Sequence, residues 1–146
     1  MHSLPRWEEL PTIELYLDQV LLYVNQHTLT DSKRDKGLTP AMINNYVKHG
    51  YLPKPIKKKY GQEHLARLII LSICKPVFAI ADIIQVIQEM SQSEGAKESY
   101  NHFVSYYNEG AVHQIAPIIQ KACQTIQAFH ETLALIPSPQ QEVDHV

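Results

Sequence analysis

The fold is decided by residues 38–52, which read Leu38-Thr39-Pro40-Ala41-Met42-Ile43-Asn44-Asn45-Tyr46-Val47-Lys48-His49-Gly50-Tyr51-Leu52. Thr39 is a good helix N-cap, and Pro40 suits the first helical turn. Gly50 suits the position after the last turn, where a left-handed backbone is common. These signals predict a helix over 40–49. Its apolar spacing predicts that four residues are buried, namely Met42, Ile43, Tyr46 and Val47, and that Ala41, Asn44, Asn45 and Lys48 face outward.

The segment after this helix, residues 51–60, is predicted to be extended. Pro53 and Pro55 prevent a helix, and each biases the preceding residue toward extended backbone. Three consecutive lysines then stand before Tyr60. We therefore expect a short hairpin, or wing, which carries Lys57, Lys58 and Lys59.

Positive charge is concentrated around these two elements. The chain has 146 residues and a formal net charge of −2, yet ten of its 13 Lys and Arg residues lie between Lys33 and Lys75. Only Asp35 and Glu63 oppose them there, so the segment carries +8 and the rest of the chain −10. Such asymmetry is typical of a surface that binds a polyanion, although a solvated basic surface has the same composition.

Apolar residues at three-to-four-residue spacing predict helices in the rest of the chain. The first is expected at about 13–27, with Thr12 as its N-cap and Ile13 on its apolar stripe. A polar loop is expected at 28–38 and a polar break at 91–95. The remaining segments are further helices at 62–74, 79–90, 97–108 and about 115–133, and flexible tails at 1–11 and 137–146.

The last helix has a heptad rhythm, through Ile115, Ile119, Ala122, Ile126, Phe129 and Leu133. Two arrangements satisfy this pattern. The stripe can pair with a second copy of the chain, or it can fold back on the helix at 97–108. We favour the homodimer, because a short reading helix gains affinity from pairing two half-sites.

Several classes of function lack support in the sequence. The longest apolar run is too short for a membrane span, and the first residues have no signal-peptide core, so we expect a cytoplasmic protein. No nucleotide-binding, hydrolase or zinc-protease motif occurs, so we expect no enzyme and no cofactor. Cys123, His130 and Glu131 share a predicted helix, but structural zinc needs four ligands, and we expect no metal. A small-molecule effector remains open, with the aromatic residues Tyr100, Phe103, Tyr106 and Tyr107 as candidates to line its pocket.

Two helices followed by a lysine-rich wing describe a winged helix-turn-helix, and these residues resemble the MerR family of bacterial transcription regulators. Residues 38–52 are similar to the recognition helix of that family and its exit, and Lys58-Lys59-Tyr60 to the basic-x-Tyr element of the wing. The resemblance covers about residues 12–90. Still closer is the resemblance to a family of small bacterial proteins known only as an uncharacterised domain with a MerR-like fold.

The resemblance implies a mainly α fold, with a MerR-like winged helix-turn-helix at 12–90 and a C-terminal helical dimerisation or effector region at 96–135. It implies a regulator that reads duplex DNA with helix 40–49 in the major groove, while lysines of the wing contact phosphates. The alternative is a non-enzymatic adaptor that binds an acidic protein through the same basic face. The candidate DNA-binding residues are Thr39, Ala41, Asn44, Asn45, Tyr46, Lys48, Lys57, Lys58, Lys59 and Tyr60.

Overall fold

The structure, a computed structural model, describes residues 3–29, 36–110 and 114–137. Most of these residues are helical, so the predicted mainly α class is confirmed. Residues 1–2 and 138–146 of the predicted tails lie outside the described residues, as does most of the predicted loop at 28–38. The elements in chain order are a 3-10 turn at Trp7–Glu9, β1 at Leu15–Tyr16, α1 at Leu17–Thr28, α2 at Pro40–Lys48, β2 at Lys59–Tyr60, α3 at Gln62–Cys74, α4 at Ile80–Glu94, α5 at Ala96–Glu109 and α6 at Pro117–Ala134.

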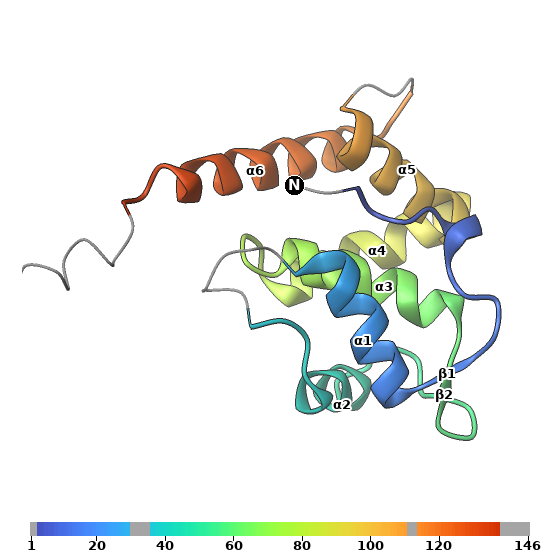
Figure 1. The fold of residues 1–146 in the computed structure, drawn as a ribbon. Coiled ribbons are helices and arrows are strands. Elements are labelled where there is room, and N and C mark those ends of the chain that lie inside the picture. The colour runs from blue at the N-terminus through green and yellow to red at the C-terminus, as the bar shows by residue number, and fades with distance from the viewer. Residues whose placement is uncertain (1–2, 30–35, 111–113, 138–146) are drawn as a thin grey trace, which may run out of the picture.

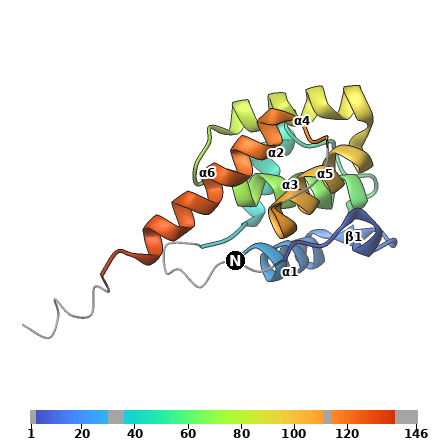
Figure 2. The ribbon, with the colours of Figure 1, turned by 90° about the horizontal axis from the view of Figure 1, so that it is seen from above.

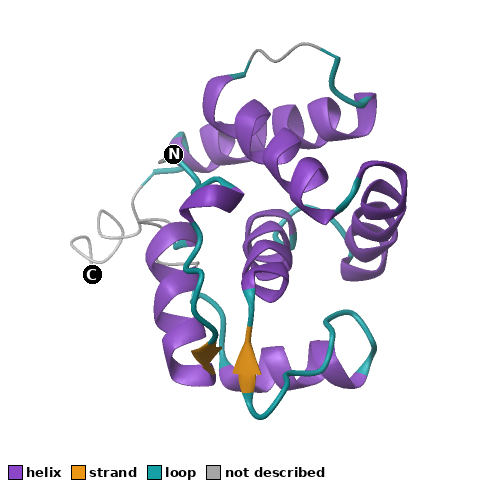
Figure 3. Cartoon of the chain, turned by 90° about the vertical axis from the view of Figure 1, so that its right-hand side faces the viewer, coloured by secondary structure: helices purple, strands orange, loops and turns teal. Residues whose placement is uncertain are grey.

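Helix α3 is the centre of the molecule, and α1, α4, α5 and α6 all pack against it. Its most deeply buried side chains include Leu65, Leu68, Ile69 and Leu71. One continuous cluster of buried residues extends from the N-terminus through α3 to α6. The segments predicted as 12–90 and 96–135 therefore share one core. Helix α2 and the short sheet lie at one edge of the molecule, and α5 and α6 lie at the opposite edge (Figures 1 and 3).

The predicted boundaries of α2 are confirmed within one residue. The Thr39 hydroxyl accepts a hydrogen bond from the Met42 N–H at 3.2 Å, which caps the helix as expected. Gly50 has a φ of +75°, the left-handed conformation that ends many helices. The helix is also tied to α1, because the Asn25 amide accepts from the Leu38 N–H at 2.8 Å and donates to the Leu38 carbonyl at 3.0 Å.

The predicted start of the first helix is wrong. Leu15 and Tyr16 are extended and pair antiparallel with Tyr60 and Lys59, so that α1 begins only at Leu17. Thr12 is therefore not its N-cap, and Ile13 is 71% exposed instead of lying on a buried stripe. Strand pairing with residues far along the chain has overridden a local helical pattern.

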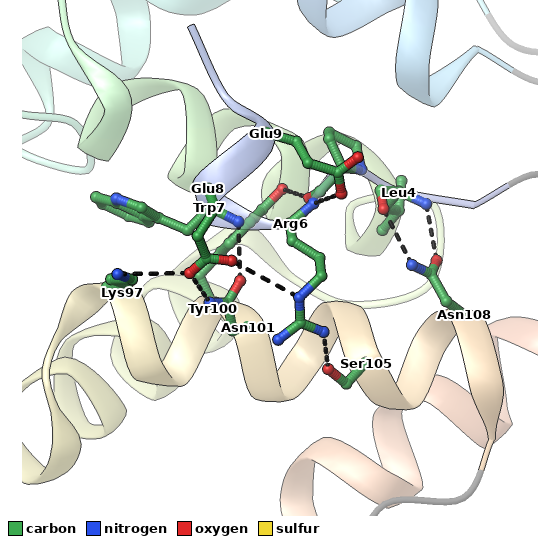
Figure 4. A network of polar contacts seen from close by, with 11 residues as sticks. Leu4, Arg6, Trp7, Glu8, Glu9, Lys97, Tyr100, Asn101, Ser105 and Asn108 are labelled. Carbon is green, nitrogen blue, oxygen red and sulfur yellow. Dashed lines mark hydrogen bonds and ion pairs between the residues drawn. The ribbon is translucent and has the colours of Figure 1, made fainter. Parts of the chain in front are cut away.

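The expectation of a flexible arm at 1–11 is wrong for the described residues 3–10, which we call the N-terminal strap. Leu4 and Leu10 are both 2% exposed and belong to the core. The strap runs along α5 (Figure 4). The Asn108 side chain accepts from the Leu4 N–H at 2.7 Å and donates to the Leu4 carbonyl at 3.0 Å, and the Tyr100 hydroxyl donates to the Pro5 carbonyl at 2.7 Å.

A second group of contacts fixes the middle of the strap. The Asn101 side chain accepts from the Trp7 N–H at 2.8 Å and donates to the Glu8 carboxylate at 2.9 Å. That hydrogen bond is the main cause that lowers the pKa of Glu8. Arg6 donates to the Ser105 hydroxyl. The strap is therefore held by polar side chains of α5 as well as by its buried leucines.

The predicted polar break at 91–95 is helical up to Glu94, and only Gly95, with a φ of +92°, ends the helix. The Glu94 carboxylate lies 3.0 Å from Nδ1 of His102 on α5, and this polar contact ties the two helices together. For the last helix, the structure shows the fold-back arrangement in its first half. Ile119, Cys123 and Ile126 are buried, and α6 packs against α5 and α3 of the same chain.

Within the described residues, no helix has both the length and the apolar character needed to cross a membrane.

Candidate nucleic-acid interface

The outward face of α2 carries the four residues that the apolar spacing predicted to lie there. Ala41, Asn44, Asn45 and Lys48 are all exposed, and their spacing places them on one side of the helix. Tyr46 is different, because it is 2% exposed and packs in the core. Its prediction as a DNA-contacting residue is therefore wrong for this structure, and its prediction as a buried residue is confirmed.

The predicted wing is a tight hairpin with lysines at its tip. Ile56 and Lys59 exchange two backbone hydrogen bonds, of 3.1 and 3.0 Å. The two residues between them, Lys57 and Lys58, have φ values of +53° and +65°. This is the arrangement of a type I′ turn, whose central positions favour Asn and Gly because other side chains are strained there. Two exposed ammonium groups thus stand on a strained turn.

The base of the hairpin is held against α1 and α3. Lys59 places its ammonium 5.4 Å from the centre of the Tyr16 ring, in a cation–π contact. Tyr60 is 4% exposed, and its ring meets the edge of His64 at 5.3 Å. Burial raises the pKa of the Tyr60 hydroxyl. Tyr60 is therefore a packing residue, and the prediction that it contacts DNA is wrong for this structure.

Two residues of α3 that the sequence did not single out fix the chain between α2 and the hairpin. Arg67 donates to the Tyr51 carbonyl at 3.0 Å. His64 accepts from the Gly61 N–H at its Nδ1, so its Nε2 carries the proton and donates to the Pro53 carbonyl at 3.0 Å. The sequence signal for the contact between His64 and the Gly61 N–H is a histidine three residues after a helix N-cap.

Helix α2 and the hairpin lie at the same edge of the molecule, opposite α5 and α6 (Figures 1 and 3), and we call their exposed residues the α2–hairpin surface. Lys36 and Lys54 are also exposed, whereas Lys33 and Arg34 lie outside the described residues. Asn side chains can pair with a base edge through two hydrogen bonds, and lysines act as point charges for phosphates. The surface is defined by Ala41, Asn44, Asn45, Lys48, Lys54, Lys57, Lys58 and Lys59.

Tyr106 and Tyr107, two of the four aromatic candidates, line a hollow of about 340 Å³ together with Cys123 and Gln127 of α6. The thiols and the other two aromatic residues have packing roles. Cys74 and Cys123 are buried, and burial raises the pKa of each thiol to about 12, which disfavours the nucleophilic thiolate. Tyr100 and Phe103 belong to the core. Across residues 3–29, 36–110 and 114–137, no three His, Cys, Asp or Glu side chains form a group that could hold a metal ion.

Comparison with known proteins identifies a family without an assigned activity. Residues 5–109 match the family model described as Domain of unknown function (DUF1836). No curated protein and no solved structure matches the chain. The predicted resemblance to an uncharacterised domain family is thereby confirmed, while the match carries no information on a MerR-like fold. Because the matched segment spans more than half of its residues, the chain belongs to the DUF1836 family.

Proposed function

We propose that this protein is a DNA-binding transcription regulator with a MerR-like winged helix-turn-helix fold. In this proposal α2 enters the major groove, and the hairpin lies on the phosphate backbone. The observation that carries it is the pairing of an exposed Asn-rich helix face with a hairpin whose strained tip presents Lys57 and Lys58. A strained backbone is retained at functional sites more often than elsewhere, which supports a binding role for this tip.

The two parts of the surface have different tasks. A B-DNA major groove admits one α-helix, and Asn44 and Asn45 present amides that can read adenine. The lysines neutralise phosphates and release counterions, which supplies affinity without sequence preference. About six neutralised phosphates give a log–log salt slope of roughly −5. The charge at the hairpin therefore sets how tightly duplex DNA is bound, and α2 sets which sequence is preferred.

A homodimer formed through the C-terminal helices is part of the proposal. Two copies of α2 then meet two half-sites, which raises both affinity and selectivity over those of one short helix.

The test is duplex binding by fluorescence anisotropy across a salt series, first with a random-sequence pool. Reversal of Lys57, Lys58 and Lys59 to glutamate is expected to abolish binding to every sequence, and N44A to change sequence preference with a smaller loss of affinity. The matched control is K97Q, which removes one exposed lysine on α5, at the opposite edge; it gives up only the exposed 3.5 Å ion pair with Glu8, which contributes little to stability. If the triple variant binds the duplex as the unchanged protein does, the proposal fails. If neither protein binds duplex DNA and the basic surface instead captures an acidic protein, the adaptor replaces the regulator.

A further inference from the structure

Arg67 of α3 is a cation in largely apolar surroundings. Its side chain is 11% exposed, and it lines a hollow of about 70 Å³ formed by the N-terminal strap and by α3 to α6, which Figures 1 and 2 show from two sides. Most of the other residues that line this hollow are apolar, and they include Trp7, Ile87, Met90 and Phe103. Burial lowers the pKa of the Arg67 guanidinium, because a charge is less stable where water is excluded.

The Arg67 guanidinium has fewer partners than it can bind. A guanidinium carries five N–H donors, and the hydrogen bond from Nη1 to the Tyr51 carbonyl, at 3.0 Å, uses one of them and fixes the group in place. Nε is buried and has no hydrogen-bond partner in the part of the chain that the structure describes. Nη2 lies 3.9 Å from the Glu63 carboxylate, which is too far for a hydrogen bond, and the Glu63 side chain is 55% exposed to solvent. Because buried charges are normally paired and hydrogen-bonded, this site has room for an anionic partner.

A second apolar hollow adjoins the first. Its volume is about 200 Å³, and most of the residues that line it, from α3, α4 and α6, are apolar. Ile87 of α4 and Phe103 of α5 line both hollows, so the two lie on either side of the same side chains. Space for an apolar group is therefore present next to the hollow that contains the cation.

We propose that this hollow binds a small amphipathic carboxylic acid, such as a medium-chain aliphatic acid. The ligand carboxylate accepts charge-assisted hydrogen bonds from Arg67 on its Nη2 side, and the exposed Glu63 side chain turns toward solvent to admit it. The aliphatic chain of the ligand lies against Ile87 and Phe103, where it loses contact with water. A ligand with a positive head group is repelled by Arg67, and a neutral one leaves the buried charge unpaired. This binding site goes beyond the proposed DNA-binding function and does not depend on it.

Trp7 reports occupancy of the hollow directly. It is the one tryptophan of the chain, it lines the hollow, and its ring meets the edge of Tyr100 with 6.1 Å between ring centres (Figure 4). We expect titration of the full chain with octanoate to change the Trp7 fluorescence in a saturable way. Hexanoate is expected to bind roughly tenfold more weakly, since each buried CH₂ group raises affinity about fourfold.

Octanol is the matched neutral ligand in the same titration. It has the same chain length but no carboxylate, so it is expected to bind more weakly by roughly tenfold or more, because it lacks charge-assisted hydrogen bonds to Arg67. If octanoate gives no saturable change in Trp7 fluorescence, or if octanoate and octanol bind equally well, the proposal is overturned.

Three variants test the roles of the side chains. E63Q removes the carboxylate that competes for Arg67 and is expected to raise the affinity for octanoate severalfold, while E98Q, on the exposed side of α5, leaves it unchanged. V86F narrows both hollows and is expected to lower the affinity roughly tenfold or more. R67Q is expected to remove the preference for octanoate over octanol. Because R67Q also loses the hydrogen bond to Tyr51, E63Q and V86F, which keep it, carry the test if R67Q does not fold. An affinity for octanoate that does not rise in E63Q, or does not fall in V86F, contradicts the proposed site.

Discussion

Replacement of the two residues at the hairpin tip is expected to stabilise the fold and at the same time to weaken DNA binding. Lys57 and Lys58 occupy left-handed backbone, which costs a non-glycine residue about 1–2 kcal/mol. The double variant K57N/K58G introduces the pair that a type I′ turn prefers. Relief at two positions, about 2–4 kcal/mol, is partly offset by about 1 kcal/mol for the greater freedom of an unfolded glycine. Asparagine at position 57 still bears part of the energetic cost of a left-handed backbone, so we expect the variant to be more stable by about 1 kcal/mol or more.

The same variant removes two cations from the α2–hairpin surface. Each phosphate contact contributes about 0.9 to the log–log salt slope, so the slope for duplex DNA is expected to become shallower by about 2. Urea unfolding measures the first effect, and anisotropy across a salt series measures the second. K97Q, on α5, is the control for loss of a lysine elsewhere and is expected to leave the slope unchanged. The reasoning is refuted if K57N/K58G destabilises the fold, or if it gains stability while its DNA affinity and salt slope are unaffected.

Three other outcomes follow from the contacts described above. T39A removes the N-cap of α2 and is expected to cost about 1 kcal/mol in urea unfolding, whereas T39S, which keeps the hydroxyl, is expected to cost much less. Y100F leaves the Pro5 carbonyl without its hydroxyl donor and is expected to cost about 1–3 kcal/mol; a value near zero would show that the strap is not held by this bond. Burial raises the pKa of Cys74 and Cys123 to about 12, so the folded state holds these thiol protons more tightly than the unfolded state. The free energy of unfolding that the buried thiols contribute is therefore fully present below about pH 9 and decreases as the pH rises toward 12. Urea unfolding midpoints measured from pH 8 to 11 are expected to fall, and constant midpoints would contradict this.

The sequence predicted best those features whose causes are local. Thr39, Pro40 and Gly50 act on residues within one turn of themselves, so the ends of α2 could be located from the sequence. The exposed positions Asn44, Asn45 and Lys48 followed from helical periodicity alone. Pro53 and Pro55 were enough to exclude a helix after α2. In each case the physical interaction spans only a few residues.

The features that were missed depend on distant partners. Leu15 and Tyr16 are extended because they pair with Tyr60 and Lys59, and a two-residue strand is too short to show alternation. The strap is ordered because side chains of α5 bind its backbone, which nothing in residues 3–10 indicates. The strained tip at Lys57 was also not predictable, because lysine is not a residue that favours left-handed backbone.

The central claim, that the outward face of α2 lies against the bases of duplex DNA, can be tested by photocrosslinking. N44C is labelled at the new thiol with a short photoreactive group, since both native thiols are buried. E98C, on the exposed side of α5 at the opposite edge, carries the same label as the control. We expect N44C to crosslink to duplex bases, E98C to give only background, and high salt to remove the difference. Equal yields from the two positions, or no duplex crosslink from N44C at low salt, would contradict the account.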